Sequence, residues 1–522
     1  MLLLLGCHLF SSPDIATCDD FGGCDTGSAD DTGHPTGGDD TDVDTGEAVD
    51  VDGDGAYRYE DCDDDNDQVS PYLDEVCGDG LDNDCDGGPN DCLVEGELTA
   101  EEAVLYVEHT SGEGDEGVGM DVAMLGDVDG DGVGEIAVGV PYSANFSGVV
   151  SVYGVDQGDG SWTEGEARLY SDQSVGIGQE VASVGDLDGD GIDDVVVAMP
   201  YWSEAASYAG AVAILYGPVS GDVELSGAVL LEHDDDYAYM GDGLTGGEVT
   251  GDSGRDLIVG GRSLNGGLGG FYVVEGDDIA DRASPESVAK ASITHPGPYS
   301  LSAQAGKPAD IDGDGVGDLV LSSPYDSDGI GMVYVLKGPL SGDLSTSDAD
   351  ASYKGPQYGY LGDGGTTVVP DTNGDGLPEL AIGAYYATGD GISYAGRVYV
   401  LAGLPGSGEA EKVASSFLLG ASQYGLFGFR VAGAELNGDG VGDIAVSAVQ
   451  DGEVYVFYGP LEGAVSTSEA PVSMGFAGGD SNFGIGLDAA DSDGDGVAEI
   501  LVGAPYAYNG RGAGLIYDLN PL

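Results

Sequence analysis

The sequence predicts an all-β fold built from repeated units, and three observations support this prediction. Glycine is the most frequent residue, at 95 of 522 positions, which suits short strands joined by tight turns and argues against a helical bundle. Alternating runs of Val, Ile, Ala and Tyr continue from about residue 98 to the end, with the period of two that strands require. An acidic loop recurs seven times within these runs.

The acidic loops mark the repeating unit. They begin at Asp127, Asp186, Glu248, Asp310, Asp371, Glu435 and Asp491. Each loop lies between a strand of small residues and a short apolar strand, and a Gly-led alternating strand such as 331–336 follows. Seven units of roughly 60 residues with about four strands each are typical of a β-propeller. A chain of independent β-domains is the alternative, but a unit of this size is marginal alone, and a closed ring removes exposed sheet edges.

The repeats also carry a specific motif. In the last repeat, Phe483-Gly484 precedes the loop 491–499, and Gly503-Ala504-Pro505 follows it. The repeats resemble the FG-GAP repeats of the integrin alpha-chain N-terminal domain and of many bacterial surface proteins. This resemblance implies a seven-bladed β-propeller over residues 98–522, in which residues 98–108 supply the outer strand of the last blade.

The spacing of oxygen-bearing side chains within the loops predicts metal sites. In the second loop, Asp186, Asp188, Asp190 and Asp194 occupy positions one, three, five and nine, and a Gly lets the chain turn back. Such oxygens, with a backbone carbonyl near position seven, suit Ca²⁺, which accepts six to eight oxygens in tolerant geometry. No His or Cys accompanies the loops, which disfavours zinc and copper, and Mg²⁺ rarely occupies an all-protein cage.

Five further loops keep these ligand positions, and one departs from them. The candidate ligands of the five are Asp127, Asp129, Asp131 and Glu135; Asp310, Asp312, Asp314 and Asp318; Asp371, Asn373, Asp375 and Glu379; Glu435, Asn437, Asp439 and Asp443; and Asp491, Asp493, Asp495 and Glu499. The third loop has Glu248, Thr250, Asp252 and Asp256 but no Gly after Asp252, so we expect a weak or empty site there. A single loop of this kind could be an ordinary Asp-Gly turn, whereas the repeated spacing favours about six calcium sites.

Acidic residues dominate the composition. The chain has 13 Lys+Arg against 97 Asp+Glu, a formal net charge of −84. Nucleic acids and anionic membrane surfaces are excluded as direct partners, because the chain offers no basic footprint for phosphate. Carboxylates at this density must be solvated or neutralised by cations, which agrees with the predicted calcium loops.

The first 49 residues contain two segments that we do not expect to form a folded domain. Residues 1–7 end in Leu4-Leu5-Gly6-Cys7, which resembles the lipobox of bacterial lipoproteins and implies a truncated signal segment with lipidation of Cys7. Only six residues precede Cys7 and none is basic, so coincidence is the alternative. Residues 8–49 are rich in Asp, Thr, Gly and Ser, which predicts a disordered acidic tether.

Residues 50–92 form a Cys- and Asp-dense module. Asp50, Asp52 and Asp54 have the spacing of an EF-hand-type loop and are candidate metal ligands. The module resembles the Asp/Cys-rich metal-binding repeat of bacterial surface proteins, including the copper-binding MopE type, although carboxylate oxygens favour calcium over copper. Two disulfides of unknown connectivity are expected among its cysteines, with a zinc site as the alternative. These cysteines are Cys62, Cys77, Cys85 and Cys92, and Cys18 and Cys24 are a further candidate pair within the tether.

The residues favour binding over catalysis. The five His are scattered outside the repeat motif, and no arrangement of nucleophile, base and orienting acid stands out. We expect a monomeric, non-enzymatic, calcium-binding propeller in the extracellular space or on the cell surface, tethered as an outer-membrane lipoprotein of a bacterium if Cys7 is lipidated. Its expected role is adhesion or another protein–protein interaction. A lectin-like carbohydrate binder, or the non-catalytic part of a carbohydrate-active or hydrolytic system, is the alternative.

Blade topology predicts where a ligand would bind. Because the acidic loop joins the first and second strands, the Pro-Tyr turn between the second and third strands emerges on the opposite face, where integrins also bind ligand. That face would carry Tyr142, Tyr201, Trp202, Tyr325, Tyr385, Tyr386 and Tyr506. Aromatic residues with a polar group are enriched at recognition surfaces. The alternative is that these rings pack between neighbouring blades.

Overall fold

The computed structural model describes most of the repeat region. The described ranges are 96–100, 103–107, 117–143, 147–155, 160–162, 166–297, 306–389, 391–476, 482–507 and 512–519, with isolated positions at 56, 62, 63, 66, 68–71, 85 and 94. Several predictions therefore lie outside the described residues. They concern Cys7, the tether 8–49 with Cys18 and Cys24, the candidate ligands Asp50, Asp52 and Asp54, and Cys77 and Cys92.

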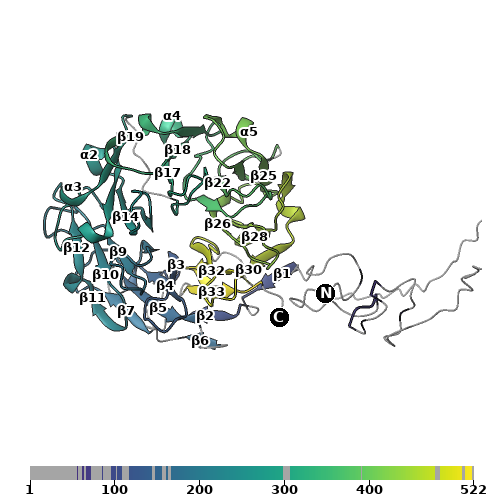
Figure 1. Ribbon diagram of the computed structural model, residues 1–522, viewed down its shortest axis with the longest axis horizontal. Coiled ribbons are helices and arrows are strands. Elements are labelled where there is room, and N and C mark those ends of the chain that lie inside the picture. The colour runs from purple at the N-terminus through teal and green to yellow at the C-terminus, as the bar shows by residue number, and fades with distance from the viewer. Residues whose placement is uncertain are drawn as a thin grey trace, which may run out of the picture.

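Seven β-sheets stand side by side around a ring, and each contains one acidic loop, so we number the blades by their loops (Figure 1). Blade 1 consists of β3 (Val122–Gly126), β4 (Glu135–Val140), β5 (Val149–Gly154), β7 (Ala167–Tyr170) and β11 (Gly221–Glu224). Blade 2 consists of β8 (Val181–Ser183), β9 (Val195–Met199), β10 (Ala211–Leu215) and β12 (Val229–Glu232). Blade 3 consists of β13 (Leu244–Gly247), β14 (Asp256–Gly261), β15 (Gly270–Glu275), β16 (Ala291–Thr294) and β19 (Gly342–Ser345).

The other four blades repeat this order, except that the first described strand of blade 4 follows its acidic loop. Blade 4 consists of β17 (Leu319–Ser323), β18 (Met332–Leu336), β20 (Ala351–Lys354) and β24 (Gly408–Glu409). Blade 5 consists of β21 (Thr366–Val369), β22 (Glu379–Ala384), β23 (Arg397–Ala402), β25 (Ser416–Leu419) and β29 (Gly463–Ser466). Blade 6 consists of β26 (Phe427–Ala434), β27 (Asp443–Ala448), β28 (Glu453–Phe457), β30 (Val472–Gly475) and β1 (Gly96–Thr99). Blade 7 consists of β31 (Leu487–Ala490), β32 (Glu499–Ala504), β33 (Ala513–Tyr517), β2 (Leu105–Val107) and β6 (Gly160–Trp162).

The predicted seven-bladed β-propeller is confirmed, and its closure follows the sequence-based expectation. Strand β2 pairs antiparallel with β33, with Leu105 opposite Ile516 and Val107 opposite Gly514, so the start of the repeat region completes the last blade. Strand β1 pairs in parallel with β30 of blade 6. The N-terminal strands therefore join blades 6 and 7 and leave no gap in the ring.

A strand donated by the next repeat extends most blades, which the sequence did not suggest. After the third strand of one blade, the chain crosses back and pairs in parallel with the outer strand of the blade before it. The pairs are β11 with β7, β19 with β16, β24 with β20, β29 with β25 and β6 with β2. Each such strand covers an edge that would otherwise be open and ties neighbouring blades together.

Single-turn helices occupy several of the connections between strands. They are η2 (Leu225–Gly227), α2 (Leu264–Gly267), η3 (Gly276–Asp278), α3 (Pro285–Val288), α4 (Asp326–Gly329), η4 (Thr346–Asp348), α5 (Ala410–Val413) and η5 (Thr467–Glu469). None of the helices in the described ranges has the length and apolar character needed to cross a membrane.

The core lies between neighbouring blades, where second and third strands are almost fully buried. The Gly in the Gly-Ala-Pro part of the motif allows this close packing. A Cβ added to Gly503 would lie 2.0 Å from the carbonyl oxygen of Gly119 in blade 1, and one added to Gly383 would lie 2.2 Å from that of Gly428 in blade 6. Because these contacts involve backbone atoms, a larger residue would push the blades apart.

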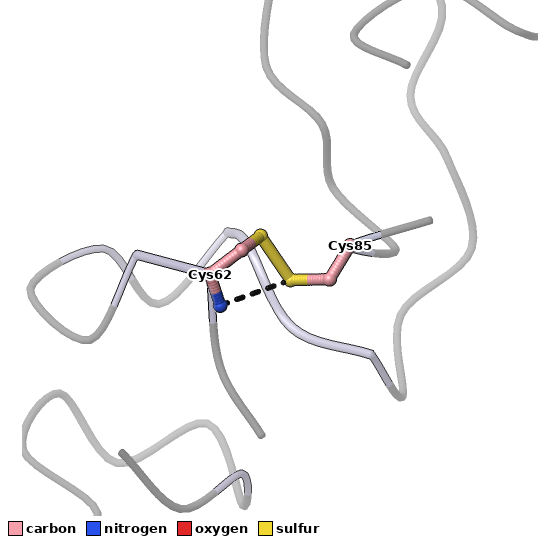
Figure 2. Close-up of a disulfide and its surroundings, with 2 residues drawn as sticks. All are labelled: Cys62 and Cys85. Carbon is pink, nitrogen blue, oxygen red and sulfur yellow. Dashed lines mark hydrogen bonds between the residues drawn. A yellow bond between two sulfur atoms is a disulfide. The ribbon is translucent and has the colours of Figure 1, made fainter. Parts of the chain in front are cut away.

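Before the propeller, a disulfide joins Cys62 and Cys85, with Cα atoms 5.7 Å apart (Figure 2). The backbone N–H of Cys62 donates to the Sγ of Cys85 at 3.2 Å. Two of the four cysteines of the module therefore form a disulfide, as one of the two predicted alternatives has it. The pairing of Cys62 with Cys85 was left open by the sequence.

Candidate metal loops and the opposite face

All seven acidic loops occupy one place in the fold, directly before the strand at their position-nine residue. In six blades the loop follows a first strand, and in blade 4 an isolated bridge between Ala309 and Asp318 stands in that place among the described residues. The residue at position nine starts or directly precedes the second strand, as Glu135 does at the start of β4 and Asp194 just before β9. The loops are also linked around the ring. The N–H of Asp193 donates to the carbonyl of Asp127 at 2.8 Å, and that of Gly442 donates to the carbonyl of Asp371 at 2.9 Å.

The position-nine carboxylate holds each loop in place through hydrogen bonds to the loop backbone. In all seven loops it is buried and accepts the backbone N–H of position two. The donors are Val128, Leu187, Val249, Ile311, Thr372, Leu436 and Ser492, at 2.5–3.0 Å. In blades 2, 4 and 6 the second carboxylate oxygen accepts another N–H, from the glycine that follows the third strand. This side chain therefore connects the loop to two strands of its blade.

Burial of these carboxylates has an electrostatic consequence. Desolvation raises the pKa of Glu135 and of Asp443 to about 7, and that of Asp194 and of Asp318 to about 6, although hydrogen bonds from backbone N–H groups oppose the shift. The neighbouring loop carboxylates raise these pKa values further. A cation bound in the loop would stabilise the ionised form of each group.

Aspartate at position one closes the turn. Asp186 accepts the N–H of Gly189 through Oδ1 at 2.7 Å and that of Gly191 through Oδ2 at 2.8 Å. Both glycines have positive φ, at 76° and 95°, a conformation that other residues rarely adopt. The same pair of contacts recurs at the position-one aspartates of blades 1, 4, 5 and 7.

Five loops bring carboxylate oxygens within 4.8 Å of one another. These groups are Asp127, Asp129 and Glu135; Asp186, Asp188 and Asp194; Asp310, Asp312 and Asp318; Asp371, Asp375 and Glu379; and Asp491, Asp493, Asp495 and Glu499. The position-five carboxylates Asp131, Asp190 and Asp314 are not in these groups. Each of them accepts the N–H of position seven, as do Asp375 and Asp495, the position-five carboxylates that do belong to the groups.

The sequence predicts six competent loops, but the structure gathers oxygens in five. The exception is the sixth loop, with Glu435, Asn437, Asp439 and Asp443. It shares Glu at position one with the third loop of Glu248, Asp252 and Asp256, which is also not gathered and was expected to be weak. The extra methylene shifts the carboxylate relative to the turn. Glu435 accepts N–H groups through Oε1 from positions three and four, whereas an aspartate there spans positions four and six.

The donor set of the five loops fits a hard divalent cation. All candidate ligands are carboxylate or amide oxygens, and no His or Cys belongs to the five groups found among the described residues. Oxygen-only loops with one buried carboxylate and more exposed ones match the preference of Ca²⁺.

The opposite face carries part of the predicted aromatic set. Tyr142, Tyr325 and Tyr506 are 39%, 50% and 43% exposed, Tyr386 is 37% exposed, and Tyr201 is half-buried.

Two residues predicted for this face instead lie in the interior. Trp202 is fully buried in a cluster with Val175 and Met199, and Tyr385 is 9% exposed with its hydroxyl donating to Asp363 at 2.7 Å. Consecutive turn residues point to opposite sides, so only one of each adjacent pair faces solvent. For these two rings the packing interpretation holds.

The same face carries tyrosines that the sequence analysis did not select. Ring contacts join them to the predicted ones. The ring centroids of Tyr208 and Tyr239 lie 6.3 Å and 6.2 Å from that of Tyr201. Tyr237 contacts Tyr208 at 5.9 Å and Tyr239 at 6.4 Å. A second row runs from blade 4 to blade 6 through Tyr325, Tyr360, Tyr386, Tyr394 and Tyr424, at centroid distances of 5.1–6.0 Å. We call this row the tyrosine row.

Two repeated patterns in the sequence could have found all of these rings except Tyr424. Tyr-x-Tyr precedes a large apolar residue and Gly at 237–241 and 358–362, directly before the first strand of a blade. Ser-Tyr-Ala-Gly occurs at 207–210 and 393–396, directly before the third strand.

Comparisons with known proteins agree with the fold. A family model described as FG-GAP repeat matches residues 119–153, 178–215 and 364–401, in blades 1, 2 and 5. Rat phosphatidylinositol-glycan-specific phospholipase D is 34% identical over 153 residues, 27% of this chain and 18% of that protein. Drosophila integrin alpha-PS2 is 28% identical over 239 residues, 42% of this chain and 16% of that protein. Xenopus laevis integrin alpha-5 is 33% identical over 207 residues, 37% of this chain and 18% of that protein.

The chain thus spans a fifth or less of the length of these relatives. The predicted FG-GAP repeats and their likeness to integrin alpha chains are confirmed. The resemblance of residues 50–92 to the MopE-type repeat stays a prediction. Among solved structures, one titled "Crystal structure of BBS1N in complex with ARL6DN, soaked with mercury" aligns over 80% of this chain and 97% of its own, with 11% identity and a TM-score of 0.39, a similarity too low to bear on the fold.

Proposed function

We propose that this chain is a calcium-binding propeller of the extracellular space or cell surface that mediates adhesion by binding a protein ligand. The observation that carries this proposal is that the two faces of the propeller present different kinds of side chain. One face gathers carboxylates in five loops, and the opposite face presents exposed tyrosines in contact with one another. The FG-GAP repeats shared with integrin alpha chains support the same role.

In this proposal calcium is structural. The ion would be held by the carboxylates at positions one, three and nine in blades 1, 2 and 4, by positions one, five and nine in blade 5, and by all four positions in blade 7. Calcium supplies positive charge that offsets the mutual repulsion of the loop carboxylates in a chain of net charge −84. In blades 2 and 4, position nine accepts N–H groups both from the loop and from the glycine after the third strand, so its neutralisation would stabilise the whole blade.

The tyrosine row would bind the ligand. Tyr394 and Tyr424 stack at 5.1 Å with their planes only 15° apart, and they are 40% and 53% exposed. Rings held by their neighbours lose little conformational freedom on binding, and tyrosine offers both apolar area and a hydroxyl. Such residues dominate the binding energy of many protein interfaces.

Histidines in the described region have structural partners, which supports a non-catalytic role. The Nε2 of His233 lies 2.6 Å from Glu286, which also accepts the hydroxyl of Tyr272 at 2.6 Å. His295 is buried, and its Nδ1 lies 2.9 Å from the hydroxyl oxygen of Thr346. Each imidazole thus links the end of an outer strand, β12 or β16, to a neighbouring short helix, α3 or η4.

A binding array tests the proposal. Fluorescently labelled chain is applied, in calcium and in EDTA, to an array of purified surface and matrix proteins beside a glycan array. We expect calcium-dependent protein hits that the double change Tyr394→Ser and Tyr424→Ser removes. The control change Tyr170→Ser, on the outer strand β7, should leave them intact. Calcium-dependent hits confined to glycans would contradict adhesion through protein.

The similarity to phosphatidylinositol-glycan-specific phospholipase D supports a second candidate function. In that case the propeller is a lectin-like or other non-catalytic part of a hydrolytic system. The glycan arm of the same array distinguishes it, because a glycan-binding accessory domain would bind there and not to proteins. Lipidation of Cys7 and metal binding by Asp50, Asp52 and Asp54 belong to the proposal as well, and mass spectrometry of the purified chain tests the first.

A further inference from the structure

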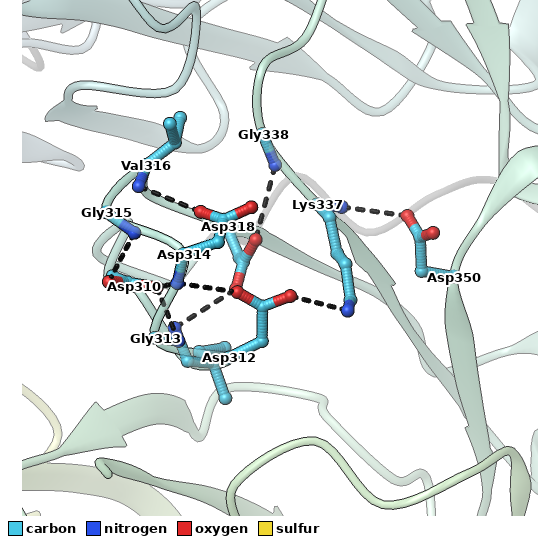
Figure 3. Close-up of polar contacts among 11 residues, drawn as sticks. Asp310, Asp312, Gly313, Asp314, Gly315, Val316, Asp318, Lys337, Gly338 and Asp350 are labelled. Carbon is cyan, nitrogen blue, oxygen red and sulfur yellow. Dashed lines mark hydrogen bonds and ion pairs between the residues drawn. The ribbon is translucent and has the colours of Figure 1, made fainter.

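One of the ligand positions of the fourth loop forms an ion pair with a lysine of the same blade. The Nζ of Lys337 lies 2.5 Å from the Oδ2 of Asp312, the carboxylate at position three (Figure 3). Asp312 is one of the three carboxylates that converge in this loop, with Asp310 and Asp318. The chain therefore places a positive charge of its own against the group of oxygens that would hold the cation.

Lys337 stands where two other blades have tyrosine. It follows β18 and precedes Gly338, whose N–H donates to Asp318 at 3.2 Å. Blades 2 and 6 repeat this contact with their own position-nine aspartates, at 2.9 Å and 2.8 Å. The residues that correspond to Lys337 and Gly338 there are Tyr216 with Gly217 and Tyr458 with Gly459. The shared backbone contact places this residue beside the loop in all three blades, and only blade 4 puts an ammonium group there.

We propose that Lys337 is a built-in counter-ion that makes loop 4 a weaker calcium site than loop 2, where Tyr216 takes the corresponding place. This inference rests on the proposed calcium binding. The ammonium competes for the Asp312 oxygen that the cation needs, and it repels a divalent ion at close range.

The positive charge of Lys337 also has a structural consequence. Because Lys337 already neutralises part of the acidic charge, loop 4 should keep its shape without calcium better than loop 2, which has Tyr216 in the corresponding place. The Lys337 side chain is 35% exposed, so it can swing into solvent when calcium enters. Its backbone N–H stays anchored to Asp350 at 3.0 Å. The expected reduction in affinity is on the order of tenfold, which is what a partly exposed ion pair and a nearby like charge produce together.

Calcium titration of the chelator-stripped full chain tests the inference. Binding is followed by isothermal titration calorimetry and by equilibrium dialysis with radioactive calcium. In Lys337→Met we expect one binding step to tighten by about tenfold. Lys412→Met is the matched control, because Lys412 pairs with Glu409 at 2.8 Å on the exposed surface of α5 and has the same charge. It should titrate like the unmodified chain.

Three further variants make the result specific to loop 4. Adding Asp312→Asn to Lys337→Met should abolish the gain, because the freed ligand is then lost. Lys337→Tyr, which copies blades 2 and 6, should tighten the same step and provides a second variant if Met perturbs folding. Tyr216→Lys should weaken one step by a similar factor.

The outcomes separate this inference from the proposed function. If the unmodified chain binds calcium and Lys337→Met titrates identically to Lys412→Met, the counter-ion role is wrong and calcium binding stands. If neither the unmodified chain nor any variant takes up calcium, the proposed calcium binding is wrong, and this inference with it.

Discussion

Removal of the Asp194 carboxylate tests whether position nine organises its loop. The side chain is fully buried, and its oxygens accept the N–H of Leu187 at 2.7 Å and that of Gly217 at 2.9 Å. Alanine leaves both N–H donors without a partner. Each unpaired donor costs about 1–3 kcal/mol of stability when it is buried, and the half-buried Gly217 costs less. We therefore expect Asp194→Ala to lower the free energy of unfolding by about 2–4 kcal/mol.

Asp194→Asn separates the hydrogen bonds from the charge. The asparagine amide keeps one acceptor oxygen. It also removes a buried carboxylate, whose pKa is raised to about 6 by desolvation. In calcium-free protein Asn should therefore be less harmful than Ala. In calcium at 100 times the dissociation constant, Asn should also lose the stabilisation that the bound ion supplies, about 2.7 kcal/mol.

Urea unfolding followed by tyrosine fluorescence, with calcium and with EDTA, measures both changes from the shift in midpoint. An Asp194→Ala protein within about 0.5 kcal/mol of the unmodified chain, the usual range for a neutral surface change, would refute the structural role of position nine. Equal effects of Asp194→Asn with and without calcium would refute its role in binding the ion.

Three further predictions follow from burial and packing. Desolvation raises the folded-state pKa of Glu135 and Asp443 to about 7. Their contribution therefore stabilises the calcium-free protein below pH 4 and is lost as the pH rises through 7. The melting temperature of the calcium-free protein should fall from pH 5 to pH 8, and a flat or rising curve would contradict this. Calcium should raise the melting temperature more at pH 8 than at pH 5, which differential scanning fluorimetry measures. Gly383→Ala should cost about 1–3 kcal/mol by overpacking, whereas Gly406→Ala, with open space around it, should be neutral in the same urea assay.

Much of the architecture could be predicted because its determinants are local and repeated. The loop spacing, the Gly-led strands and the Pro-Tyr turns recur in register, so seven copies support each assignment that one copy would leave ambiguous. The closing strand 105–107 could be placed because a ring must pair its two ends. The position of the loops between first and second strands followed from the same strand order.

Details that depend on neighbouring blades could not be read from the repeats. The parallel strands such as β11 and β19 pair with the preceding blade, and their short sequences carry no sign of that partner. Trp202 and Tyr385 follow the same turn as exposed tyrosines, but the packing of adjacent blades decides which ring turns inward. The sixth loop has oxygens at every expected position, and only the three-dimensional reach of Glu435 sets it apart.

Anomalous diffraction from crystals of the chain soaked in terbium, a calcium substitute with a strong signal, tests the central claim most directly. The account predicts peaks in the loops of blades 1, 2, 4, 5 and 7, with the blade 4 peak filling after the blade 2 peak as the terbium concentration rises, and no peak in the loop of Glu248. Empty loops at saturating terbium, or a peak at Glu248 that matches the other five, would contradict it.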